Sequence, residues 1–184
     1  MFGIENYLGF IAAGIILNLT PGANTMYILT ISISQGRKAG IYSIFGIISG
    51  FLVHTFFASL GLSIILAKSA IAFSIIKYIG VVYLVYLGIR KIIDSKNSFI
   101  SNSSKTELID IKKIYLQGVL TNILNPKMAV FFLAFLPQFI NPDYATGSVP
   151  FMILGVTFMT TGTVWFLFLA YAASLITKTL REND

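Results

Sequence analysis

In Asn18-Leu19-Thr20-Pro21-Gly22-Ala23-Asn24-Thr25, a proline and a glycine stand side by side in the middle of residues 6–36, a run with no charged side chain. Proline lacks an amide donor and its ring collides with the carbonyl one turn earlier, and glycine adds backbone freedom. A helix over this run is therefore predicted to break at the proline. A second apolar run is interrupted in the same way by Asn122-Ile123-Leu124-Asn125-Pro126-Lys127.

The composition around these two interruptions indicates a membrane protein. Of the 184 residues, 56% are hydrophobic and only 11% are charged, which leaves too little polar surface for a soluble domain of this size. The alternative is a very apolar soluble helical bundle. The chain has no cysteine, so disulfides are excluded. The first fourteen residues hold no Lys or Arg, and we expect a retained helix rather than a cleaved signal peptide.

Long apolar runs define the predicted spans. Each exceeds the roughly 20 residues that cross about 30 Å of hydrocarbon, and they do not alternate in polarity as strands would. The sequence therefore predicts an all-α polytopic membrane protein with five transmembrane helices and lipid around it. The five runs are residues 6–36, 39–67, 69–89, 114–142 and 144–177.

The distribution of Lys and Arg predicts the orientation. Arg37 and Lys38 join the first two spans, six cations lie between residues 90 and 113, and Lys178 and Arg181 follow the last span. Such an excess marks the cytoplasmic side. We expect a protein of the cytoplasmic (inner) membrane with its N-terminus outside and its C-terminus inside. The net charge of +6 then encodes topology, and no nucleic acid is expected as a partner.

The two proline segments also predict an internal repeat. Superposing Pro21 on Pro126 sets an offset of 105 residues, and that offset carries residues 39–67 onto the last span. The first half starts outside and holds three spans, so the second starts inside, which makes an inverted-topology repeat. We expect one transporter domain over residues 1–184, with repeat one at 1–100 and an incomplete repeat two at 106–184. The alternative is that each proline merely kinks its helix.

Broken helices of this kind build solute sites. A half-helix that begins at a proline presents unpaired N–H groups and a positive dipole end to a carboxylate, while unwound carbonyls suit an ammonium group. An amino-acid zwitterion carries both charges. The predicted solute-binding residues are Pro21, Gly22, Ala23, Asn24, Thr25, Asn122, Asn125, Pro126 and Lys127.

Two of the ionisable residues inside the predicted spans invite a functional hypothesis. His54 is the only histidine of the chain, and the unperturbed pKa of histidine, about 6.5, suits a proton carrier. Its alternative is a neutral side chain hydrogen-bonded to a neighbouring helix. Lys127 either attracts the solute's carboxylate or snorkels to the interface.

Several segments resemble the LysE/RhtB family of amino-acid exporters over the whole chain. They are Thr20 to Thr25, Ser34-Gln35-Gly36-Arg37-Lys38-Ala39-Gly40, Lys77-Tyr78-Ile79-Gly80, Tyr83 to Gly88, Gly118 to Lys127, and Phe135-Leu136-Pro137-Gln138-Phe139. The resemblance implies a secondary transporter, driven by the proton gradient, that exports amino acids or derivatives such as lysine, homoserine, threonine or homoserine lactone. It implies no cofactor.

One departure from that family concerns its usual sixth helix. The run 69–89, moved by the repeat offset, would fall at 174–194, but the chain stops at Asp184. We therefore expect uncovered faces on the fourth and fifth spans, with small and polar residues that lipid cannot hydrogen-bond. Either a homodimer covers them or the chain is a shortened, weakly active exporter. The residues expected there are Thr157, Thr160, Thr161 and Gly162.

The function predicted from the sequence is export of an amino acid or an amino-acid derivative, not an enzymatic reaction. With one histidine, no cysteine and no carboxylate inside a span, neither a zinc site nor an acid–base pair is expected. A serine–histidine hydrolase within the membrane ranks far below transport, because no GxSxG motif is present. The main alternative is a non-transporting accessory or assembly subunit derived from such an exporter.

Overall fold

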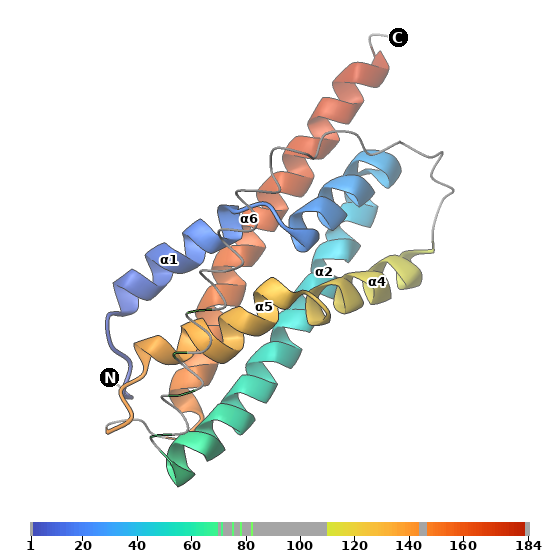
Figure 1. Ribbon diagram of the computed structural model, residues 1–184. Helices are drawn as coiled ribbons and strands as arrows, with labels where there is room; N and C mark the ends of the chain where they lie inside the picture. The colour runs from blue at the N-terminus through green and yellow to red at the C-terminus, as the bar shows by residue number, and fades with distance from the viewer. Residues whose placement is uncertain are drawn as a thin grey trace.

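The computed structural model describes residues 2–69, 71, 75, 78, 82, 110–143 and 147–182, and in this part the chain is helical without a β-strand. The helices lie side by side as a bundle (Figure 1). The predicted all-α class is confirmed. The elements are α1 (Tyr7–Leu19), α2 (Ala23–Lys68), α4 (Ile111–Ile123), α5 (Pro126–Val130), the π-helix η2 (Phe131–Phe135), the 3-10 helix η3 (Leu136–Phe139) and α6 (Val149–Glu182).

The long helix α2 consists of two helices joined at Gly36. This residue has φ 83° and ψ 177°, a backbone region that essentially only glycine occupies. The chain reverses direction there (Figure 1), one residue before Arg37 and Lys38. The first two predicted spans therefore meet where the charge pattern placed their junction.

Phenylalanines tie the helices together in the core. Phe10 of α1, Phe51 of α2, Phe131 of η2 and Phe158 of α6 are all almost completely buried. The rings of Phe131 and Phe158 stack with centroids 3.9 Å apart, and Phe158 meets Phe51 edge to face at 5.4 Å. Such aromatic pairs add to the stabilisation that burial alone provides. Both halves of the chain thus share one core.

Glycines let α2 and α4 approach at backbone distance. A Cβ added to Gly46 would lie 3.0 Å from the Cα of Gly118, and one added to Gly118 would lie 2.8 Å from the carbonyl oxygen of Ser43. One turn further along, a Cβ on Gly50 would lie 2.5 Å from the Cβ of Asn122. Small residues serve this purpose in membrane helices.

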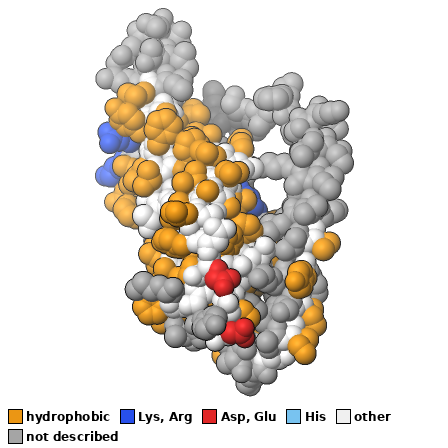
Figure 2. Space-filling model, turned by 90° about the vertical axis from the view of Figure 1, so that its left-hand side faces the viewer, with side chains coloured by type: hydrophobic (Ala, Val, Ile, Leu, Met, Phe, Trp, Pro, Cys, Tyr) orange, Lys and Arg blue, Asp and Glu red, His pale blue; other side chains and the backbone are white. Residues whose placement is uncertain are grey.

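Length and apolar composition make two described helices capable of crossing a membrane, Ala23–Leu62 and Val149–Leu175, and a third if the bent pair Ile111–Ile123 and Pro126–Phe139 is one span. Hydrophobic side chains are spread over the described surface on the face drawn in Figure 2. The predicted third span, 69–89, lies almost wholly outside the described residues, as does the polar segment 95–104. The count of five spans therefore stays a prediction.

The expectation of an uncovered face on the last predicted span, here α6, is wrong for most of the residues named for it. Helix α1 packs on that face instead. The hydroxyl groups of Tyr7 and Thr157 are 2.7 Å apart, and Asn18 Nδ2 donates to Thr161 Oγ1 at 3.2 Å. Gly162 is buried against the amide of Asn18. Of the four residues, only Thr160 is exposed.

Candidate functional site

The first break separates α1 from α2. Helix α1 ends at Leu19, and α2 begins at Ala23 after Gly22, which has an extended backbone. The side chain of Thr20 is turned back, and its hydroxyl donates to the carbonyl of Ile16 at 2.8 Å. No side chain of the described residues caps the first turn of α2. The N-terminus of α2 therefore keeps its anion-attracting amides available.

The second break separates α4 from α5, and the chain bends by 50° between Ile111–Ile123 and Pro126–Phe139. Helix α4 ends at Ile123 and α5 begins at Pro126. Here the break carries its own cap, because Asn125 Oδ1 accepts the backbone N–H of Lys127 at 3.1 Å. Both helices thus break where the two prolines predict.

The two breaks meet inside the bundle. Asn125 Nδ2 donates to Asn24 Oδ1 at 3.2 Å, and both side chains are buried. Beside this bond lies a cavity of about 10 Å³, which is room for about one water molecule. The Asn24 amide nitrogen has no partner among the described residues. The cavity is lined by Asn18, Gly22, Asn24, Thr25, Asn125, Lys127, Met128 and Phe166.

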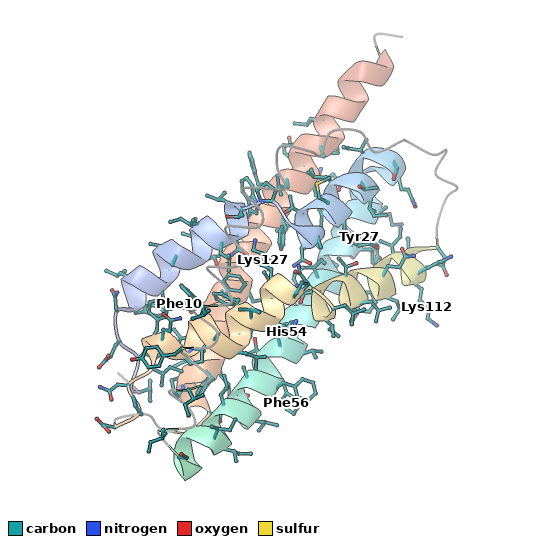
Figure 3. The ribbon with its side chains drawn as sticks, viewed as in Figure 1. Phe10, Tyr27, His54, Phe56, Lys112 and Lys127 are labelled. Carbon is teal, nitrogen blue, oxygen red and sulfur yellow. The ribbon has the colours of Figure 1, made fainter. Side chains whose placement is uncertain are left out.

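Lys127 joins the second break to the first. Its Nζ donates to the carbonyl oxygens of Leu17 and Thr20 at 2.7 and 3.0 Å, and Figure 3 places it at the end of α1. These carbonyls lie at the C-terminus of α1, where the partial charge is negative and the usual helical partners are missing. The ammonium group therefore supplies hydrogen bonds to the carbonyls that the first break leaves without helical partners.

His54 makes the corresponding contact at the second break. Its ring lies parallel to that of Phe132, with centroids 5.4 Å apart, and its Nε2 is 3.2 Å from the carbonyl oxygen of Asn122. Because that oxygen can only accept, Nε2 carries the hydrogen in this contact. The offset of 105 residues that the sequence predicts would pair Leu17 with Asn122. The carbonyls of these two residues are each bound by a distant ionisable side chain, Lys127 and His54 respectively.

The structure brings together five of the predicted solute-binding residues as cavity lining: Gly22, Asn24, Thr25, Asn125 and Lys127. The other four lie elsewhere. Pro21, Ala23 and Pro126 are exposed, so they shape the breaks without facing the cavity. Asn122 is completely buried against Gly50, and its side-chain amide has no partner in the described part of the chain.

Three cavity residues were missed by the sequence reasoning: Asn18, Met128 and Phe166. Asn18 carried a usable signal, since an amide one helical turn before Gly22 in a charge-free run lies on the same face as the break. Met128 follows Lys127 directly but is apolar. Phe166 gave no signal, because α6 holds several aromatic residues and only the packing tells which one faces the breaks.

The chain matches the LysE type translocator family over residues 15–184. It is 33% identical to the uncharacterized membrane protein YrhP of Bacillus subtilis, over 98% of this chain and 89% of the relative. An uncharacterized membrane protein of Vibrio cholerae is 32% identical, over 94% and 83% of the two chains. A leucine efflux protein of Klebsiella pneumoniae is 27% identical, over 99% and 85%. No solved structure matches.

Proposed function

The chain belongs to the LysE type translocator family, and we propose that it exports an amino acid or amino-acid derivative across the cytoplasmic membrane in exchange for protons. The observation that carries the proposal is the meeting of the two helix breaks at a small cavity that Asn24, Asn125 and Lys127 line. The relative named as a leucine efflux protein supports an amino acid as the solute. No enzymatic step belongs to the proposal.

The charges around the cavity suit both ends of a zwitterion. The solute's carboxylate would accept from the uncapped N-terminus of α2 and from Asn24 Nδ2. Its ammonium group would donate to the carbonyl oxygens of Leu17 and Thr20, to which Lys127 donates in this structure. The solute would thus replace a cation of the protein with its own, and the released Lys127 would approach the carboxylate.

The present cavity holds about one water molecule, so binding requires the breaks to separate. In an inverted repeat, the two halves rock against each other around a fixed site. Residues 1–100 and 106–184 would be those halves, within a single domain. For the halves to separate, the Asn24–Asn125 and Lys127–Leu17 hydrogen bonds must break, because they join one half to the other.

The decisive test is efflux from proteoliposomes that hold the purified chain and a labelled amino acid. We expect solute-dependent efflux that an opposing proton gradient accelerates. His54→Ala should remove this acceleration but spare exchange of solute down its own gradient, because Asn122 then loses its ionisable partner. His54→Ala with an unchanged response to the gradient would contradict the coupling role. Failure of the wild-type chain with every amino acid would favour the accessory-subunit alternative.

The proposed orientation places the C-terminus inside. Figure 1 shows the N-terminus at one end of the bundle and the C-terminus, with the turn inside α2, at the other. In this cysteine-free chain, Lys38→Cys should resist an impermeant thiol reagent in intact cells, while Asp143→Cys should react. Both side chains are exposed, so burial does not account for the difference. The opposite labelling pattern would reverse the orientation.

A further inference from the structure

A cleft of about 480 Å³ lies between α1 and α6, next to the cavity at the breaks. Its walls are apolar for the most part, with Ile15 and Leu19 from α1 and Val164, Trp165 and Phe168 from α6. No residue that lines it in the described part of the chain carries a charge. The cleft therefore suits an apolar group and disfavours a cationic or anionic one.

Asn18 connects the cleft with the cavity, because its side chain lines both. Its amide nitrogen donates to Thr161 Oγ1 at 3.2 Å, and Thr161 lines the cleft. Gly162 provides the room for the Asn18 amide, since a Cβ at that position would lie 3.1 Å from Asn18 Oδ1. The cavity and the cleft therefore adjoin at the side chain of Asn18.

We propose that this cleft is the subsite for the solute's side chain, and that the exported solute is an amino acid with a large apolar side chain. The inference rests on the proposed function, because it places the α-carboxylate and ammonium groups at the breaks. Those polar groups enter past Asn18, and the apolar side chain stays between α1 and α6. An occupant with a polar head and an apolar tail matches both spaces, whereas an acyl chain would match the cleft alone.

The only tryptophan of the chain, Trp165, reports directly on the cleft. Its ring stacks on Phe168 with centroids 5.6 Å apart, so an entering side chain will change its emission. In proteoliposomes, L-leucine should change Trp165 fluorescence saturably, while glycine and L-lysine should not. In vesicles with brominated acyl chains, L-leucine should protect Trp165 from quenching. Quenching that L-leucine leaves unchanged would show that lipid fills the cleft and would overturn the proposal.

Val164→Phe narrows the cleft and provides the matching transport test. It should raise the L-leucine concentration for half-maximal efflux by about 10-fold or more, the size of effect that a few methylene groups have in an apolar pocket. Alanine efflux should change less than about twofold, since its methyl group does not reach the cleft wall. The control is Val156→Phe, an exposed valine of the same helix that does not line the cleft, and it should behave as wild type.

The outcomes separate this proposal from the proposed function. Efflux of L-leucine and L-lysine at equal rates, insensitive to Val164→Phe, would overturn the subsite and leave the exporter intact. A saturable Trp165 response without any efflux would support the subsite as a binding site and refute export. Absence of both would refute the two together.

Discussion

Lys127→Met should reduce solute export at least tenfold while the protein still inserts into the membrane. The substitution removes the donors that bind the Leu17 and Thr20 carbonyls at 2.7 and 3.0 Å. In the proposed cycle Lys127 leaves these carbonyls for the solute's carboxylate, and Lys127→Met removes the cation that the carboxylate would meet. A hydrogen bond to a charged group contributes about 1.5–3 kcal/mol, which reaches the roughly 1.4 kcal/mol that corresponds to a tenfold change. Initial efflux rates at equal protein density measure the effect.

Two variants show whether this effect belongs to the site. Lys127→Arg keeps a cationic donor and should retain a measurable fraction of export. Lys113→Met removes a lysine that is exposed on the first turn of α4, and should leave export unchanged. If Lys127→Met inserts and exports at the wild-type rate, the ammonium group has no part in the transport cycle.

Gly46→Val should lower the stability of the folded chain more than any surface change. Its added side chain would clash with the carbonyl oxygen of Tyr115 and the Cα of Gly118. These are backbone atoms, so they cannot relieve the clash by a rotamer change as a flexible side chain could. Overpacking of this kind costs about 1–3 kcal/mol even where side chains can shift. Thermal unfolding in detergent should therefore show a clear decrease in Tm. The α2–α4 contact must separate to admit the larger residue.

The matched control lies on the same helix. Gly61 is exposed, and a Cβ added there meets nothing within 4 Å. Gly61→Val should therefore leave the Tm nearly unchanged. Equal melting temperatures for Gly46→Val and wild type would mean that α2 and α4 do not pack at backbone distance.

The positions of the breaks could be predicted from sequence because they follow from local chemistry. Pro21 and Pro126 cannot sit inside a regular helix, whatever surrounds them. The turn at Gly36 also has a local signal, because this glycine is followed directly by the charged residues Arg37 and Lys38. Asn24 and Asn125 could be predicted to line the cavity because each stands next to one of the two breaks. Each of these predictions required only one residue type and its neighbours in the chain.

The contacts between the halves could not be predicted in this way. The Lys127 hydrogen bonds join residues 110 and 107 positions apart, and no periodicity indicates which carbonyl an ammonium group will reach. The packing of α1 on Thr157 and Thr161 was missed for a similar reason. The repeat suggested a missing partner helix, whereas the broken first helix itself covers that face. The π-helical segment Phe131–Phe135 has no local signal at all.

The unequal capping of the two breaks has a consequence for the proposed transport cycle. The side chain of Asn125 caps the N-terminus of α5, while the N-terminus of α2 has no side-chain cap and can bind an incoming ligand. In the proposed cycle the two predicted halves would then not be energetically interchangeable, and the inward-open and outward-open states would differ in free energy when no solute is bound. Since a ligand's apparent affinity falls with the population of the state that binds it, the proposed site would hold its solute more tightly from one side of the membrane than from the other.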